Sequence, residues 1–420
     1  MSDRDEPDVE LTDAAASVPL RRNRNFQLLW IGQVLSDLGS QFGALAYPLL
    51  ILALTHSPVI AGVVGTVTAI TAFAVRLPAG ALADRLDRRK TMITVDAVRT
   101  VVLLVLAVLV ALHEIVWPVV LLVAMVDRIG DTMFTPASTA ALPEIVEDRQ
   151  LEGAWAATEA RQYAASLGGP ALGGILFGLG RAVPFIGDTI SYGVSVLTSS
   201  AMKGSFRPPR SDAERKGLWH DAFEGLRLIW HDALLRAVIV QAPLINFAFS
   251  GVIFTVTLSL QRHGTSATVI GLTQSAIMVG GLLGAVAAPR FQGRYSLTQL
   301  VVALTAGGTI LFAVAALIVP SPLMAIPIAI PFFISPVTNA ALFAAMLRKT
   351  PAEMRGRVNN ALLQMATGLA AFSPLVAGLF VAHTSSHWAM GVFALTLSVS
   401  AVLAMTLKGL RNAEAAEQPA

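Results

Sequence analysis

Twelve long apolar segments run through this sequence, and they limit the folds open to it more than any other feature. A helix needs about 20 apolar residues to cross a bilayer, and each segment reaches that length. Charged residues make up only 14% of the chain, whereas soluble domains contain about 25%. We therefore expect an all-α integral membrane protein with about 12 transmembrane helices. The segments are Phe26–Leu54, Val59–Ala83, Thr91–Leu112, Val116–Ala140, Gly153–Leu179, Val183–Met202, Leu234–Gln261, Thr268–Ala288, Leu297–Ile318, Pro322–Leu347, Arg357–His383 and Trp388–Leu407.

Positive charge is distributed unevenly between the two sides of these segments. If the amino terminus is cytoplasmic, 22 lysine and arginine residues fall on the cytoplasmic side. Only Arg181 and Arg262 then fall in outer loops. Because cytoplasmic loops of membrane proteins carry an excess of Lys and Arg, this bias predicts that both termini are cytoplasmic. We expect a multi-pass protein of the cell (inner or plasma) membrane.

The longest polar connection, Lys203–Asp232, divides the chain into two halves of six helices. It contains Trp219, Phe223, Leu226 and Trp230 at helical spacing, which predicts an amphipathic helix at the membrane surface. A helix that binds a partner protein is the alternative. The predicted units are a disordered tail (1–24), the first half (25–203), the linker with its amphipathic helix (204–233), the second half (234–408) and a second tail (409–420). Weak similarity between loops of the two halves predicts pseudo-two-fold symmetry, with a ligand site between the halves.

Several classes of function find no support in the sequence. The chain contains no cysteine, which excludes disulfides, thiol nucleophiles and cysteine metal sites. It also has no Gly-rich nucleotide loop, no cluster of metal ligands and no nucleophile constellation, so we expect no enzyme activity, no metal and no cofactor. The net charge of +3 is dispersed over many short loops, so we do not expect nucleic-acid binding. Residues Met1–Pro19 are polar and have no apolar core, which argues against a cleavable signal peptide.

The connection Gly80–Lys90 combines one carboxyl with four bases between two apolar segments. Asp84 stands where a helix leaves the membrane, beside Arg85, Arg88, Arg89 and Lys90. Such an acid can pair with the neighbouring cations. Asp96 and Arg99 follow near the cytoplasmic end of the next helix, spaced to pair with each other. We expect them to pack with Asp84 and Arg88. We interpret these residues, with Gly80, as a cytoplasmic gate: Gly80, Asp84, Arg85, Arg88, Arg89, Asp96 and Arg99.

The fifth apolar segment contains a proline among small residues, Ala165-Ser-Leu-Gly-Gly-Pro170-Ala-Leu-Gly-Gly174. A proline inside a helix removes one backbone hydrogen bond and bends the helix. Glycines let a second membrane helix approach closely. We expect Gly169, Pro170, Gly173 and Gly174 to form a hinge, with plain small-residue packing as the alternative.

These motifs resemble those of a known family. Gly80–Lys90 resembles the signature loop of the major facilitator superfamily of secondary transporters, although Asp87 replaces the usual glycine of a tight turn. The segment 165–174 resembles the motif that marks antiporters in that superfamily. Two further stretches, Phe26–Ser40 and Asp188–Tyr192, are similar to the macrolide-efflux and siderophore (enterobactin) exporter-like branch. The resemblance implies the major facilitator fold and export driven by the proton gradient.

Ionisable residues inside apolar segments are costly, so each is expected to face a cavity or a partner. Burial disfavours the charged form of a carboxyl, which makes such acids candidate proton carriers. Asp37 is the first candidate, because Gln33, Asp37 and Gln41 form one polar stripe. A structural acid is the alternative reading. Asp127, Asp131 and Glu159 are the other candidates for proton coupling.

Two arginines are candidate partners for these acids. Arg128 stands three residues before Asp131 and can pair with it within one helix. Arg76 is a candidate partner for Asp37 or Asp127. The second half has almost no charge inside its apolar segments, so its amides are the candidates there for binding an apolar, weakly hydrogen-bonded ligand. With the two glutamines of the polar stripe, the cavity candidates are Gln33, Gln41, Asn246, Gln274, Asn339 and Gln364.

We interpret the chain as a proton-coupled antiporter that exports a small amphipathic or hydrophobic compound, such as a drug, antibiotic or siderophore, by alternating access. Its expected partners are that small molecule, protons and the lipid bilayer, and we expect a monomer. An importer (symporter) of a nutrient or metabolite with the same fold is one alternative. A non-transporting membrane sensor or lipid-handling protein is another.

Overall fold

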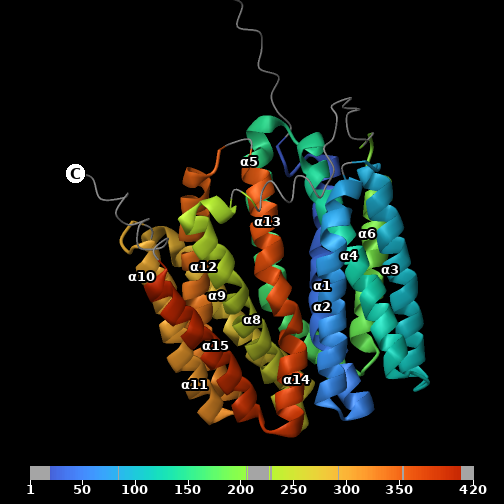
Figure 1. Cartoon of the computed structure of the whole chain (residues 1–420). Helices are drawn as coiled ribbons and strands as arrows, with labels where there is room; N and C mark the ends of the chain where they lie inside the picture. Colours follow the sequence, from blue (N-terminus) through green and yellow to red (C-terminus); the bar gives the residue numbers. More distant parts are fainter. Residues whose placement is uncertain are drawn as a thin grey trace, which may run out of the picture.

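The computed structural model describes residues 19–83, 85–204, 206, 227, 229–291, 293–351 and 354–407. Nearly all of the described chain is helical, and it contains no strand (Figure 1). The first half consists of α1 (Arg24–Thr55), α2 (Pro58–Ala83), α3 (Arg88–Ala111), α4 (Trp117–Ile145), η1 (Asp148–Gln150), α5 (Leu151–Leu179) and α6 (Val183–Ala201). The second half consists of α8 (Ala233–Arg262), α9 (Ala267–Phe291), α10 (Leu297–Val302), η2 (Ala303–Gly307), α11 (Gly308–Ile318), η3 (Pro322–Met324), α12 (Ala325–Lys349), α13 (Arg355–Gly368), η5 (Leu369–Phe372), α14 (Ser373–His383) and α15 (Ser386–Thr406).

These helices cross the membrane twelve times, as the apolar segments predict. Within the described ranges, nine helices or helix groups are long and apolar enough to span a bilayer by composition. The other three crossings are α4, α5 and α6. Of these, α4 packs against α2 and α3, α5 packs against α1 and α9, and α6 packs against α1 and α3. They carry the polar and charged residues that lower their hydropathy. The all-α membrane fold with two six-helix halves is confirmed.

Two of the predicted helices are irregular in the structure. The segment expected to run unbroken to His383 is divided into α13, a short 3₁₀ turn and α14. Pro374 stands in the first turn of α14, where a missing N–H is tolerated. The segment Leu297–Ile318 contains a π-helical turn, η2, between α10 and α11. Sequence periodicity identifies apolar length but does not identify such local changes of helix type.

The two halves meet mainly along two pairs of helices, α5 with α9 and α2 with α14. We call the end of the bundle that holds the α2–α3 connection the basic end. The glycines at these crossings, Gly62 and Gly378, Gly174 and Gly271, all lie toward the opposite end. The halves are therefore joined most closely at the end away from the basic loops.

The predicted domain boundaries remain predictions. Almost all of the expected amphipathic helix lies outside the described residues. Its described members, Arg227, Ile229 and Trp230, are helical. The two predicted tails, 1–24 and 409–420, also lie largely or wholly outside them.

Candidate functional site

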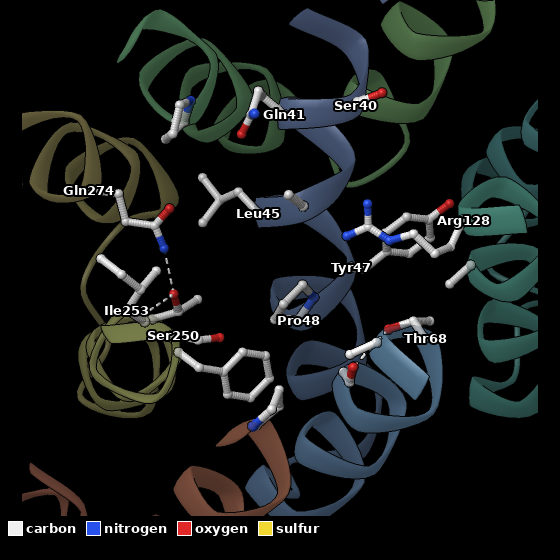
Figure 2. A pocket seen from close by; sticks show the side chains of 18 of the residues that line it. Ser40, Gln41, Leu45, Tyr47, Pro48, Thr68, Arg128, Ser250, Ile253 and Gln274 are labelled. Carbon is white, nitrogen blue, oxygen red and sulfur yellow. Dashed lines mark hydrogen bonds between the residues drawn. The ribbon is translucent and has the colours of Figure 1, made fainter. Parts of the chain in front are cut away.

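A cavity of about 450 Å³ lies between the two halves. Its first-half wall comes from α1, α2, α4 and α5, with Arg99 of α3 reaching in from behind. Its second-half wall comes from α8, α9, α12 and α14. Figure 2 shows Gln274 and Ser250 on the opposite side of the cavity from Tyr47 and Arg128. The cavity thus occupies the interface at which a ligand site was predicted.

The two walls differ in chemistry. Among the described residues that line the cavity, those with a charge are all in the first half: Arg99, Asp127, Arg128 and Asp131. The second-half wall is mainly apolar and aromatic, with Phe249, Ile253, Phe254, Met278 and Phe332. Its amide is Gln274, whose Nε2 donates to Thr257 Oγ1 at 2.6 Å. A ligand in this space would contact apolar surface on one side and charge on the other.

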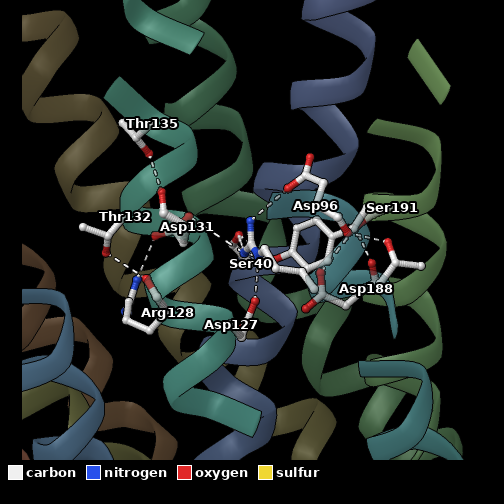
Figure 3. Close-up of polar contacts among 12 residues, drawn as sticks. Ser40, Asp96, Asp127, Arg128, Asp131, Thr132, Thr135, Asp188 and Ser191 are labelled. Atoms are coloured by element: carbon white, nitrogen blue, oxygen red, sulfur yellow. Dashed lines mark hydrogen bonds and ion pairs between the residues drawn. The ribbon is translucent and has the colours of Figure 1, made fainter. Parts of the chain in front are cut away.

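Arg99 is the centre of the charged wall. Its side chain is only 1% exposed, and its Nε donates to Asp127 Oδ1 at 2.8 Å. Nη1 lies 3.5 Å from Asp96 Oδ1, and Nη2 lies 4.0 Å from Asp131 Oδ1. Figure 3 shows Asp96, Asp127 and Asp131 around this position. One buried guanidinium therefore faces three carboxyls from two helices.

Hydroxyl groups complete this cluster. Arg99 Nη2 donates to Ser40 Oγ at 3.3 Å and also to the hydroxyl of Tyr192. The guanidinium carbon lies 3.7 Å from the centroid of the Tyr192 ring, close enough for a cation–π interaction. Tyr47 donates its hydroxyl to Asp127 Oδ2 at 3.3 Å. These contacts tie α1, α3, α4 and α6 together at the same depth.

Asp188 of α6 is a member of this region that the sequence reasoning did not select as a site residue. Its side chain is fully buried between α6 and α1, against Gly39 and Gly43. Ser191 donates its hydroxyl to Asp188 Oδ1 at 3.3 Å, while Oδ2 has no hydrogen-bond partner among the described residues. An acid within an otherwise apolar segment was the signal that could have identified it.

The predicted pair within α4 is present. Arg128 Nη1 donates to Asp131 Oδ2 at 3.1 Å. Both side chains are partly exposed, Asp131 at 34% and Arg128 at 47%, although they lie near the middle of the helix. They are exposed because they face the cavity.

Asp37 has a different partner from the one predicted. Arg161 of α5 places its Nη1 2.7 Å from Asp37 Oδ2, with the arginine 4% exposed and the aspartate 29% exposed. Arg76, the predicted partner of Asp37 or Asp127, instead donates to Thr367 Oγ1 of α13 at 3.1 Å. That prediction was wrong, because the rotation of α2 turns Arg76 toward the second half. Glu159, two residues before Arg161 on α5, is exposed and is not among the residues that line the cavity.

Asp96 and Arg99 pair with each other, as their spacing predicts, but they lie elsewhere than predicted. They were expected near the helix end with Asp84 and Arg88. Arg99 is eleven residues into α3, in the middle of the bundle, while Arg88 pairs with Glu144 of α4. Asp84 itself lies outside the described residues. Arg99 and Arg88 are therefore too far apart along α3 to belong to one cluster.

The basic loop is held by its own half. Arg88 donates to the carbonyl of Ala140 at 3.0 Å, and Arg89 Nε donates to the carbonyl of Ser199 at 3.0 Å. Arg85 is exposed, and Gly80 has open space where a side chain would be.

Asp87 does not adopt the positive φ that its replacement of glycine suggested. Its φ is −64°, and its carboxylate accepts the N–H of Lys90 at 3.1 Å, so Asp87 caps the amino terminus of α3.

The predicted cavity amides are distributed over several environments. Gln41 and Gln274 line the cavity, whereas Gln33 is buried in the first half. Asn246 and Asn339 are exposed, and Asn246 donates to its own helix. Gln364 of α13 donates to the carbonyl of Phe73 on α2 at 2.9 Å.

The glycines of α5 serve two neighbours. Gly169 lies against the side chain of Gln41 and Gly173 against the backbone of Phe42, both on α1. Gly174 instead meets α9, where an added Cβ would lie 3.0 Å from Gly271 Cα. The motif thus provides close crossings with one helix of each half.

Comparison with known proteins gives consistent matches. A family model described as "transmembrane secretion effector" matches residues 14–420. The multidrug efflux pump Tap of Mycolicibacterium fortuitum is 24% identical over 414 residues, covering 93% of this chain and 98% of that protein. The enterobactin exporter EntS of Citrobacter koseri is 24% identical over 361 residues, covering 86% of each. A crystal structure of a mutant of the nucleoside transporter NupG has a TM-score of 0.74 at 12% identity, covering 92% of this chain and 100% of that one. At that identity the structural match establishes the fold alone.

Proposed function

The chain belongs to the transmembrane secretion effector family of the major facilitator superfamily, and on that premise we propose that it exports a small amphipathic or hydrophobic compound in exchange for protons. Both relatives named above are exporters: Tap is a multidrug efflux pump, and EntS is an enterobactin exporter. An exporter of a drug, antibiotic or siderophore is therefore the function that we test first.

The observation that supports proton coupling is the excess of carboxyls over bases in the cluster beside the cavity. Three carboxyls, those of Asp96, Asp127 and Asp131, lie around Arg99. The buried Asp188 is close enough to interact electrostatically with Arg99 and Asp127, and Arg128 is the second base. Uncompensated charge in the membrane interior costs several kcal/mol, so the two excess acids need protons or a cation. A cationic or polar substrate group and a proton would then compete for the same carboxyls. That competition is the physical basis of exchange.

Asp131 is the acid best placed to exchange with the cavity. It lines the cavity and lies 4.0 Å from the Arg99 guanidinium. Its side chain is 34% exposed, compared with 12% for Asp127 and 0% for Asp96. Asp37 is paired with a buried arginine at 2.7 Å and is not among the residues that line the cavity. We therefore place Asp131 before Asp37, Asp127 and Glu159 as the proton carrier.

Alternating access is supported by the way the halves are joined. Their glycine crossings lie toward one end, and the bonds of Arg88 and Arg89 at the basic end stay within the first half. With the basic end assigned to the cytoplasm from its Lys and Arg content, this arrangement corresponds to a transporter closed toward the outside. The protein would release its substrate when the halves rock to the opposite arrangement.

Two other functions can be compared with the same site. An importer of a sugar or organic anion would need more hydrogen-bonding or basic groups on the second-half wall, which is mainly apolar. A non-transporting sensor has no need of a cavity between the halves lined by partly exposed acids. We therefore favour export over both alternatives.

The test is proton movement in liposomes that contain the purified protein and a pH-sensitive dye. Macrolides, lipophilic cations and catechol siderophores would be added with an imposed pH gradient. We expect substrate-triggered proton movement in the wild type and in Glu159→Gln, and its loss in Asp131→Asn. The matched control is informative because Glu159 is an exposed acid away from the cavity lining.

Two outcomes would change the proposal. Proton movement that survives in Asp131→Asn and disappears in Asp37→Asn would move the proton site to α1. Substrate accumulation without proton movement in the wild type would refute antiport while leaving export intact.

A further inference from the structure

The two junctions that join the halves are built alike, residue by residue. In the first junction, α5 of the first half crosses α9 of the second. In the second junction, α14 of the second half crosses α2 of the first. Each pairs a helix that contains a proline (Pro170 or Pro374) with a helix that contains a glycine (Gly271 or Gly62).

The backbones touch at equivalent positions in both junctions. A Cβ added to Gly174 would lie 3.0 Å from Gly271 Cα, and a Cβ added to Gly378 would lie 3.2 Å from Gly62 Cα. Gly174 and Gly378 each stand four residues after the proline of their helix. The equivalence arises from the pseudo-two-fold relation between the halves.

A hydroxyl group completes each junction. The backbone N–H of Ala171, directly after Pro170, donates to Ser275 Oγ at 3.0 Å. The N–H of Leu375, directly after Pro374, donates to Thr66 Oγ1 at the same distance of 3.0 Å. Ser275 and Thr66 each stand four residues after the glycine of the crossing, so all three elements of the junction are repeated.

The prolines explain why these backbone groups use a side chain from the other half. A proline inside a helix disturbs the preceding turn, and the N–H groups at a helix start have no acceptor within the helix. Pro170 lies within α5, and Leu375 is in the first turn of α14. A membrane provides no water to satisfy such a group, so the hydroxyl across the interface is its replacement.

The position of the junctions connects them to transport. Ala171 and Leu375 each stand eight residues before the end of their helix, and Thr66 and Ser275 each stand eight residues after the start of theirs. All four helix ends are at the end of the bundle opposite the basic end. Pro170 and Pro374 also line the cavity. The two junctions therefore close the cavity on that side.

We propose that Thr66 and Ser275 are positioning residues that hold the halves closed at this end, and that both bonds break when the cavity opens there. Each hydroxyl acts through the N–H that follows a proline rather than through the substrate. Loss of either hydroxyl removes a bond that is made only in the closed arrangement, which shifts the population toward the open one. This inference rests on the alternating access proposed above.

The measurement is the distance between the halves at the closed end, by electron paramagnetic resonance of paired spin labels. The chain has no native cysteine, so Glu114→Cys and Thr384→Cys introduce one label in an exposed loop of each half. In Thr66→Val and in Ser275→Ala we expect the ratio of closed to open protein to fall about threefold. In the double variant we expect it to fall about tenfold. These values follow from the usual strength of hydrogen bonds between membrane helices. The measurement needs neither substrate nor a proton gradient, so it can fail independently of proton-coupled export.

Matched controls lie on the same two helices. Thr71 and Thr273 donate their hydroxyls to carbonyls of their own helices, at 2.8 and 2.7 Å. Thr71→Val and Thr273→Val should leave the distances of the wild type unchanged, and Thr66→Ser, which keeps the hydroxyl, should restore them. Distances unchanged in Thr66→Val and Ser275→Ala would overturn the proposal. An equal shift in the controls would also overturn it, because it would reflect general loosening of the helices.

Discussion

The strongest prediction concerns Arg99, because it is the buried base around which the carboxyls of the first half are arranged. Arg99→Gln leaves Asp96 and Asp127 buried without their cation, at positions where the wild-type distances are 3.5 and 2.8 Å. Removing one partner of a buried ion pair costs about 3–5 kcal/mol. We expect the free energy of unfolding to fall by that amount.

Arg128 provides the matched comparison. Arg128→Gln removes an arginine of the same half that also pairs with an acid, at 3.1 Å, but the side chain is 47% exposed. Exposed pairs contribute about 0–1 kcal/mol, so the effect should be several-fold smaller. The difference between the two variants depends on burial rather than on the presence of an ion pair.

The assay is reversible unfolding of the purified protein in mixed detergent micelles, followed by the helical signal. The double variant Arg99→Gln with Asp127→Asn should recover part of the loss, because it removes one of the carboxylates left without a cation. Equal destabilisation by Arg99→Gln and Arg128→Gln would refute the reasoning. So would a double variant whose loss equals the sum of the two single losses.

Two further predictions concern residues that the structure places in new roles. Asp188→Asn keeps the hydrogen bond of Ser191 but removes one excess carboxyl, so we expect fewer protons moved per substrate in the liposome assay, with Ser191→Ala as the control that retains the acid. An unchanged proton count would show that Asp188 is a structural acid. Asp87→Ala removes the amino-terminal cap of α3 and should cost about 0.5–2 kcal/mol in the same unfolding assay, whereas Asp87→Asn should cost little. If Asp87 served a glycine-like turn instead of a cap, Asp87→Ala and Asp87→Asn would lower the free energy of unfolding equally.

Some features of the charged site follow from spacing within one helix. The pair of Arg128 and Asp131 is predicted by their separation of three residues, because residues at that spacing lie on the same helix face. The apolar character of the second-half wall also follows from the scarcity of charge in its segments. Both features are local in sequence, so no knowledge of neighbouring helices is needed to expect them.

Contacts between helices could not be predicted in the same way. Arg161 as the partner of Asp37, Thr367 as the partner of Arg76 and the central place of Arg99 all depend on how each helix is rotated about its axis. A rotation of one residue, about 100°, turns a side chain from one neighbour to another. The identity of each partner is therefore decided by packing.

The sequence by itself determined that this protein is a twelve-helix membrane protein, because a bilayer admits only helices or closed barrels and requires about 20 apolar residues for each helix. It also contained both copies of the proline, glycine and hydroxyl pattern, separated by about two hundred residues. Only the tertiary structure brought Pro170 to Gly271 and Ser275, and Pro374 to Gly62 and Thr66. The physical reason is that backbone contact and hydrogen bonding between helices act over a few ångströms, and only the packed halves bring these segments that close.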